Sequence, residues 1–149
     1  MLKQNHFMKL AIDEAKKSLI KNEVPVGAII VDKNKNIISK AHNRVEEKKN
    51  PLFHAEKIAI DKALSKTRKK FLDNCDIWVT LKPCQMCLGI IKLVRIKRLY
   101  YGANDPNVTF IQNNNNLYNK VCSEIYGGIE EDECSKLLSI FFKKIRSGL

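Results

Sequence analysis

The stretch of sequence that decides the fold runs from residue 76 to residue 102 and reads DIWVTLKPCQMCLGIIKLVRIKRLYYG. Residues 76–80 predict a buried strand, and Pro83 then opens a helix that we expect over about residues 84–94. Residues 98–102 predict the next strand. A strand, a helix and a second strand in this order indicate an α/β layer fold.

The neighbouring sequence continues the alternation of helices and strands. On the N-terminal side we expect a helix over roughly residues 5–21, a strand over 26–31, a returning strand over 37–42, a charged loop over 44–51 and a helix over about 55–65. On the C-terminal side we expect a loop over 105–119, a short strand near 121–125 and a closing helix over 132–146. The expected architecture is one sheet with helices on both faces, in a single domain over residues 1–149.

Composition excludes several classes of protein. Hydrophobic residues make up 44% of the 149 residues, which is enough to build a core and excludes wholesale disorder. No apolar run approaches the roughly 18 residues that a membrane-spanning helix needs. The N-terminal segment has no apolar region typical of a signal peptide. We therefore expect a cytoplasmic protein with no membrane partner.

The chain is strongly basic, with 27 Lys and Arg against 16 Asp and Glu and a net charge of +11. An excess of this size favours a polyanionic partner such as a nucleic acid. Enrichment in Lys, Asn and Ile is also what an AT-rich genome produces, and 22 of the basic residues are Lys. Charge alone therefore leaves both explanations open.

The five cysteines are residues 75, 84, 87, 122 and 134. An odd number in a reducing compartment argues against a disulfide framework. Cys84 and Cys87 have the two-residue gap of a metal-binding or redox pair, and we expect the other three to be small buried apolar groups.

Two short motifs carry the chemistry: His54-Ala55-Glu56 and Pro83-Cys84-Gln85-Met86-Cys87. One imidazole and two thiolates make three ligands for Zn²⁺ and leave a fourth position for water, as in catalytic zinc sites. Zinc lowers the pKa of that water to roughly 7, and Glu56 could take its proton and hand it on. A redox pair remains an alternative, and so does a structural zinc with a fourth ligand from His42, Cys75 or Cys122.

With these motifs the chain resembles the bacterial tRNA-specific adenosine deaminases of the cytidine/deoxycytidylate deaminase superfamily. The resemblance spans about residues 7–146 and is carried by Asn22-Glu23-Val24-Pro25-Val26-Gly27-Ala28, His42-Asn43-Arg44, His54-Ala55-Glu56, Pro83-Cys84-Gln85-Met86-Cys87, Gly102-Ala103-Asn104-Asp105 and Asp132-Glu133-Cys134. It implies a three-layer α/β/α cytidine-deaminase-like fold around a five-stranded mixed sheet, and a homodimer. It also implies conversion of adenosine to inosine at the wobble position of a tRNA anticodon stem-loop, with one zinc per subunit.

The resemblance assigns roles to individual residues. It implies that His54, Cys84 and Cys87 bind zinc and that Glu56 is catalytic. Among residues near the substrate, Asn43 would contact the target base, and the others are Val26, Gly27, Ala28, Ala55, Pro83 and Asp105. For Asn43 a turn residue at a strand end is the alternative role, and for Val26 plain core packing.

Three departures from the family pattern concern the surroundings of these residues. Leu52 and Phe53 replace small residues before the His-Ala-Glu motif, and Lys82 replaces the usual Glu before Pro83. The segment after Asp105 is rich in Asn instead of Gly, Ala and Ser. None of them removes a metal ligand or Glu56, so they bear on the choice of substrate. A deaminase of guanine, cytosine or a nucleoside, and a non-catalytic zinc-stabilised RNA-binding module, are the alternative functions.

An RNA enzyme needs a basic rim around an open pocket, whereas a free-base enzyme would close its pocket with a lid. The basic residues that could supply such a rim are Lys48, Lys49, Lys66, Arg68, Lys69, Lys70, Lys143, Lys144 and Arg146. Four of them form the connector at residues 66–70, which could equally be a solvated surface run.

Overall fold

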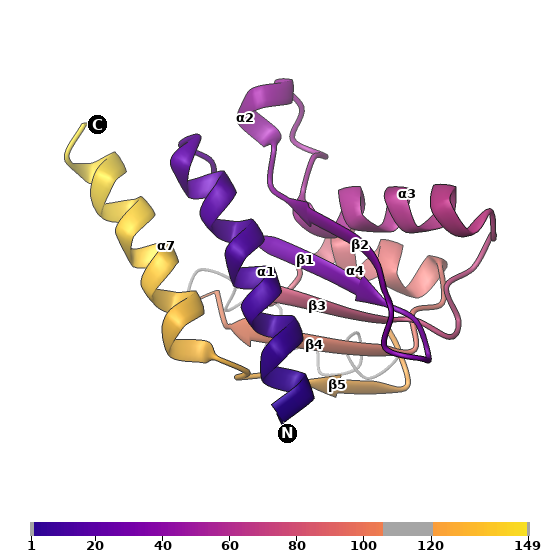
Figure 1. Ribbon diagram of the computed structural model, residues 1–149. Coiled ribbons are helices and arrows are strands. Elements are labelled where there is room, and N and C mark those ends of the chain that lie inside the picture. The colour runs from indigo at the N-terminus through magenta and orange to yellow at the C-terminus, as the bar shows by residue number, and fades with distance from the viewer. Residues whose placement is uncertain (1, 106–120, 149) are drawn as a thin grey trace.

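A computed structural model of the protein describes residues 2–105 and 121–148. In it a sheet lies between two layers of helices (Figure 1). The helices are α1 (Leu2–Ile20), α2 (Val45–Lys48), α3 (Ala55–Thr67), α4 (Gln85–Leu93) and α7 (Glu131–Arg146). The strands are β1 (Gly27–Val31), β2 (Ile37–His42), β3 (Asp76–Leu81), β4 (Arg98–Ala103) and β5 (Glu124–Tyr126).

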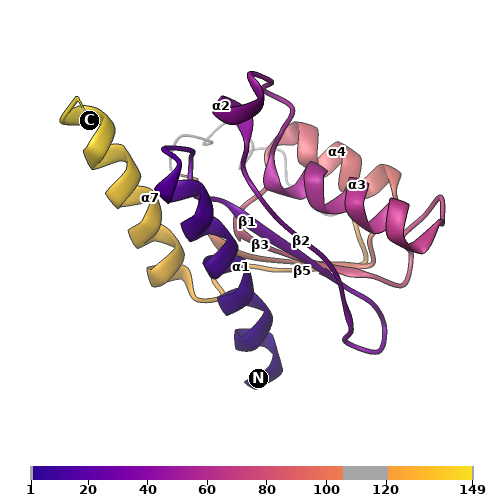
Figure 2. The same cartoon turned by 45° about the horizontal axis from the view of Figure 1, so that its top comes forward.

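The sheet is mixed and has the strand order β2-β1-β3-β4-β5. β1 pairs antiparallel with both β2 and β3, while β3–β4 and β4–β5 are parallel pairs. The parallel pair β3–β4 needs a crossover, which α4 provides. α1 and α7 cover one face of the sheet, and α3 and α4 cover the other (Figure 2). The expected three-layer architecture with five strands is confirmed.

Alternation of side chains along the strands divides the interior into two cores. In β1, Ala28 and Ile30 pack in the core beneath α3 and α4, whereas Ile29 and Val31 pack beneath α1. Because successive side chains of a strand point to opposite faces, an almost entirely apolar strand is what a sheet covered on both sides requires. Both helical layers are therefore fixed against the same central strands.

The predicted order of elements is confirmed, and most boundaries agree to within three residues. The expected loop at 44–51 contains the short helix α2, and the last strand lies at Glu124–Tyr126 instead of 121–125. The loop expected over 105–119 lies outside the described residues except for Asp105. All five cysteines are free, with Cys75 and Cys134 buried and Cys122 half-buried.

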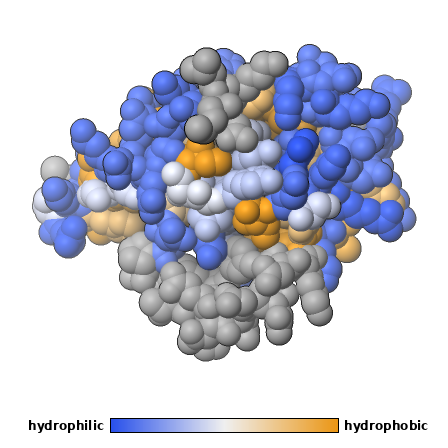
Figure 3. Space-filling model, turned by 90° about the horizontal axis from the view of Figure 1, so that it is seen from below, coloured by the Kyte–Doolittle hydropathy of each residue, from blue (hydrophilic) through white to orange (hydrophobic). Residues whose placement is uncertain are grey.

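No helix among the described residues is long and apolar enough to cross a membrane. The face of the molecule seen in Figure 3 is hydrophilic on both flanks, with small hydrophobic patches near its centre.

A buried carboxylate ties α1 to the end of β2. Glu14 on α1 accepts hydrogen bonds from His42 Nδ1 and Lys17 Nζ, each at 3.0 Å. Burial alone would raise the pKa of Glu14, but these hydrogen bonds outweigh burial and hold the pKa below its usual value. The stabilisation is present above the unfolded pKa of Glu14 and is lost as the pH falls through the folded pKa.

We expect Glu14→Gln to lower the free energy of unfolding by about 1–3 kcal/mol at pH 7, because it removes the charge of a buried acceptor. The difference from the unmodified protein should shrink as the pH falls below about 4.5. Urea unfolding at a series of pH values measures both quantities. Asp13→Asn, at the exposed neighbouring position on α1, is the control and should change little. A pH-independent loss for Glu14→Gln would contradict the assigned ion pair.

Candidate active site

Three potential metal ligands meet where α3 and α4 begin. His54 is the residue just before α3, and Cys84 is the residue just before α4, both with extended backbone. Cys87 lies in the first turn of α4 and is buried. His54 Nδ1 lies 3.6 Å from Cys84 Sγ and 3.5 Å from Cys87 Sγ, and the three ligand atoms all lie within 4.8 Å of one another.

These separations fit a zinc ion. A tetrahedral Zn²⁺ with bonds of about 2.3 Å to sulfur and 2.05 Å to nitrogen places those two atoms about 3.6 Å apart. No other His, Cys, Asp or Glu among the described residues joins the group, so His42, Cys75 and Cys122 supply no fourth ligand. Three protein ligands leave one coordination position open, which is the pattern of catalytic zinc sites.

The electrostatics of the ligands favour a bound cation. A hydrogen bond from Cys87, followed by one from His54, lowers the pKa of the Cys84 thiol to about 4 despite its partial burial. The bond to Cys84 and burial both raise the pKa of Cys87, so Cys87 is the sulfur that keeps its proton in the absence of a metal. A metal replaces that proton and needs both sulfurs as thiolates.

Glu56 is the buried acid of the site. It lies in the first turn of α3, two residues after His54, and is only 4% exposed. Burial raises the pKa of its carboxyl group to about 7. A carboxyl group with this pKa can both accept and release a proton near neutral pH.

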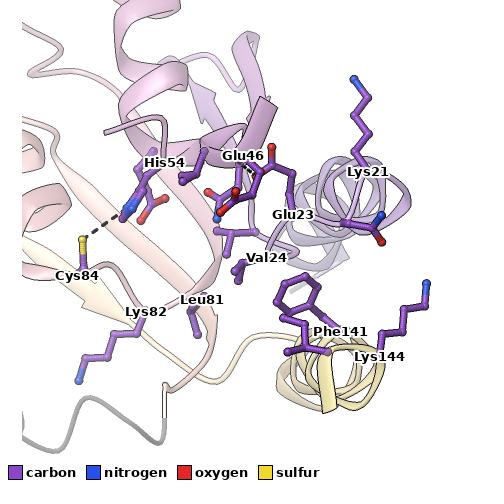
Figure 4. Close-up of a pocket in the computed structure, with 16 residues that line it drawn as sticks. Lys21, Glu23, Val24, Glu46, His54, Leu81, Lys82, Cys84, Phe141 and Lys144 are labelled. Atoms are coloured by element: carbon purple, nitrogen blue, oxygen red, sulfur yellow. Dashed lines mark hydrogen bonds between the residues drawn. The ribbon is translucent and has the colours of Figure 1, made fainter. Parts of the chain in front are cut away.

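His54, Cys84 and Glu56 line a pocket of about 660 Å³ (Figure 4), and the third ligand, Cys87, is buried behind its wall. The pocket begins at His54 and Cys84 and extends between the ends of α1, α2 and α7. The residues that line it are Lys21, Asn22, Glu23, Val24, Val26, Asn43, Val45, Glu46, His54, Glu56, Leu81, Lys82, Cys84, Phe141, Lys144 and Ile145. A nucleobase is small enough to enter a pocket of this volume.

Two of the residues expected near the substrate line this pocket, Val26 and Asn43. The side-chain oxygen of Asn43 accepts a hydrogen bond from the backbone N–H of Ala55 at 2.8 Å. Its backbone is also fixed, because Ser18 Oγ donates to Asn43 O at 2.9 Å. With the oxygen engaged, the amide nitrogen is the group that Asn43 can offer to a molecule in the pocket.

The other expected substrate residues do not line the pocket. Gly27 faces α1, where an added Cβ would lie 1.9 Å from Ala11 O, so helix packing explains this glycine. Ala28 and Ala55 are buried in the core beneath α3 and α4. Pro83 and Asp105 lie outside the set of residues that line it.

The basic connector at residues 66–70 does not lie at the pocket. α3 has 13 residues and begins at the ligand site, so its far end lies about 20 Å away. Lys66, Arg68, Lys69 and Lys70 are at that far end, are exposed and do not line this pocket, which agrees with the alternative of a solvated surface run. Lys144 lines the pocket as expected, together with Lys21 and Lys82.

Of the departures from the family pattern, the segment after Asp105 lies outside the described residues, and Lys82, Phe53 and Leu52 lie in different environments. Lys82 lines the pocket, and its ammonium lies 5.6 Å from the centre of the Tyr101 ring. Phe53 packs against the core beneath α3 and α4 and does not line the pocket. Leu52 is exposed. Of these three residues, Lys82 is the one placed to influence a substrate directly.

Sequence reasoning missed most of the outer pocket wall. Lys21 and Glu23 follow α1, Val45 and Glu46 belong to α2, and Phe141 lies near the end of α7. No local motif marks these residues, because they meet only once both helical layers are in place. The one available signal was the segment 22–28, in which Glu23 had been given no role.

The family model for the cytidine and deoxycytidylate deaminase zinc-binding region matches residues 1–103. The chain is therefore a zinc-dependent deaminase. A tRNA-specific adenosine deaminase from Rickettsia bellii is 47% identical to it over 93% of this chain and 99% of the relative. The chain belongs to the family of tRNA-specific adenosine deaminases.

Two solved structures resemble the chain to different degrees. One, from a study of A-to-I editing by tRNA:A34 deaminases at the wobble position of transfer RNA, is 35% identical with a TM-score of 0.78. That match covers 89% of this chain and 99% of the other. A guanine deaminase from Bacillus subtilis is 32% identical with a TM-score of 0.65, over 71% of this chain and 68% of the other.

Proposed function

We propose that this protein deaminates adenosine to inosine at the wobble position of a tRNA anticodon by zinc-dependent hydrolysis. The observation that carries the proposal is a three-ligand zinc group with one open position beside the buried carboxyl group of Glu56, inside an accessible pocket. The near full-length similarity to tRNA-specific adenosine deaminases supports RNA as the substrate.

In this proposal His54, Cys84 and Cys87 hold the zinc ion. When bound, zinc lowers the pKa of water from 15.7 to roughly 7 and so supplies a strong nucleophile at neutral pH. His54 binds through Nδ1, which faces both sulfurs. The start of α4 favours the two thiolates, because backbone N–H groups at a helix start stabilise negative charge.

Glu56 moves the protons of the reaction. Its carboxylate takes a proton from the attacking water and passes it to the purine, and a second transfer places a proton on the exocyclic nitrogen. That nitrogen leaves as ammonia, while the oxygen of water stays on the ring as the carbonyl of inosine. Burial serves this task because the resulting pKa of about 7 matches both directions of transfer.

Asn43 and Val26 orient the base. Asn43 would donate a hydrogen bond from its amide nitrogen, since its oxygen is held by Ala55 N–H. Val26 provides an apolar wall against the flat face of the ring. Asn43 would therefore supply a directional hydrogen bond and Val26 an apolar packing contact, a combination found in many ligand pockets.

Lys21, Lys82 and Lys144 lie around the pocket in positions to meet the phosphates on either side of an extruded nucleotide. A loop nucleotide of an anticodon is already unpaired, so it costs little to place in a pocket. We therefore propose the anticodon stem-loop as the part of the tRNA that binds here, in the cytoplasm.

We also propose that the protein acts as a homodimer. Met86, Ile90 and Leu93 recur at helical spacing on α4; Met86 and Ile90 are partly exposed and Leu93 is 74% exposed. An apolar stripe of this kind on a helix indicates a protein–protein contact. Sedimentation of the zinc-loaded protein tests the assembly.

Metal analysis is expected to give one zinc per chain, and X-ray absorption should show two sulfur ligands and one imidazole nitrogen. Cys87→Ser should lower zinc affinity by at least about tenfold, because a hydroxyl is a much poorer zinc ligand than a thiolate. Cys134→Ser, at a buried cysteine outside the ligand group, is the matched control. A third sulfur ligand would contradict the assigned set.

The function is tested with a panel of anticodon stem-loops, free adenine, guanine and cytosine, scored for inosine and ammonia. We expect turnover of a stem-loop with adenosine at the wobble position and little turnover of free bases. Faster turnover of guanine than of any stem-loop would favour the alternative that the Bacillus subtilis guanine deaminase represents. No turnover of any substrate by the zinc-loaded protein would favour a non-catalytic RNA-binding module.

A further inference from the structure

A second buried carboxylate in the pocket takes no part in the reaction described above. Glu23 lies between α1 and β1 and is only 2% exposed. Its Oε1 accepts a hydrogen bond from the backbone N–H of Glu46 at 2.8 Å, and its Oε2 accepts one from the N–H of Glu47 at 2.9 Å. Figure 4 shows Glu23 directed toward Glu46. Both carboxylate oxygens of Glu23 thus accept hydrogen bonds from the start of α2.

Little else holds α2 in place. It has four residues, none of them buried, and Arg44 just before it makes no side-chain capping bond. Glu47 forms ion pairs with Arg44 and, at 3.9 Å, with Lys21, but these side chains are about a third or more exposed and the Arg44 pair is local to the segment, so both pairs add little. Backbone N–H groups at a helix start have no partner within the helix, and a carboxylate satisfies them well.

The bonds of Glu23 join two parts of the pocket wall. Residues 21–24 form one part of the wall, and Val45 and Glu46 of α2 form the part that adjoins it. The inner site has separate supports, since Arg44 N–H donates to Phe53 O and Asn43 Oδ1 accepts from Ala55 N–H. The carboxylate of Glu23 therefore fixes the position of α2 in the wall of the outer pocket and does not support the zinc ligands.

We propose that Glu23 is a positioning residue that holds α2 against residues 21–24 and so sets the outer pocket for the RNA loop. This inference rests on the proposed function for its substrate. A carboxylate is required because it presents two acceptors to two N–H donors. A glutamine of the same shape presents one acceptor and one NH₂ group, which would face a second donor.

The first test compares Glu23→Gln with Glu47→Gln, which makes the same charge change in α2 but leaves both bonds of Glu23 in place. In hydrogen exchange, the amides of residues 46 and 47 should exchange at least about tenfold faster in Glu23→Gln, with no change in the strand amides. In stem-loop kinetics, KM should rise about tenfold while kcat stays within about twofold, since the lost interaction acts on binding. Zinc content should be unchanged.

Glu23→Asp keeps the negative charge but shortens the side chain, and it should give a smaller rise in KM with a similar gain in exchange. Glu23→Asp also replaces Glu23→Gln as the test variant if Glu23→Gln does not fold. Unchanged KM in both variants would overturn the proposal, and so would loss of zinc, which would place Glu23 among the supports of the metal site. If the unmodified protein deaminates no stem-loop, the proposed function fails, whereas the exchange rates still decide whether Glu23 holds α2.

Discussion

Glu56→Gln should abolish deamination of a stem-loop, with kcat lowered by about 10²–10⁴-fold, while one zinc per chain stays bound. Glutamine has nearly the same shape as glutamate but cannot accept a proton from water or return it to the leaving nitrogen. Glu56 is not one of the three ligands that face one another in the metal group, so its replacement leaves those ligands intact. Single-turnover kinetics with metal analysis on the same samples measure both effects.

Glu133→Gln is a suitable control. Glu133 lies exposed in the first turn of α7, so this substitution makes the same chemical change away from the pocket. It should keep near-normal kcat. Loss of zinc from a folded Glu56→Gln protein would mean that the carboxylate supports the metal, and retained turnover would show that another group moves the protons.

Reversing charge at Lys21 and Lys144 together should weaken stem-loop binding by more than about tenfold. Both residues line the pocket and carry charge at the mouth. Each phosphate contact that is lost should also lower the slope of log affinity against log salt by about 0.7–0.9. Binding isotherms at several salt concentrations measure the affinity and the slope.

Lys69→Glu with Lys70→Glu provides the matched control, with the same change of charge at the far end of α3. A smaller effect is expected there, because that end lies about 20 Å from the ligand site, beyond the screening length of about 10 Å at 0.1 M salt. If the two double variants lost the same stem-loop affinity, that result would contradict the place assigned to the RNA at the pocket mouth.

The sequence predicted the central layers of the fold because their pattern is strong. β1 and β3 are almost entirely apolar and α3 follows a helical period, so each segment has one structure that buries its side chains. α2 escaped prediction because it has no buried residue and depends on Glu23, which lies more than twenty residues away in the chain. β5 has three residues and little burial, so pairing with β4 fixes its position more than its own pattern does.

The candidate site divides in the same way. His54, Glu56, Cys84 and Cys87 stand in two short motifs whose spacing follows from the first turn of a helix, so local sequence was sufficient to identify them, whereas packing of α3 and α4 on the same face of the sheet brings the two motifs together. The outer pocket comes from the ends of α1, α2 and α7, and its composition follows from how the two helical layers meet across the sheet. Gly27 shows the limit of motif reasoning, since its missing side chain makes room for α1.

The metal group also has a mechanical consequence for the polypeptide. His54 and Cys84 are 30 residues apart, so an ion bound to both acts as a crosslink that closes a loop containing all of α3 and β3. A covalent crosslink over a loop of this length stabilises a fold by about 3–4 kcal/mol through the entropy of the unfolded chain. A newly made chain that finds no zinc therefore loses more than its activity, because it unfolds more often and exposes its backbone to proteases more often.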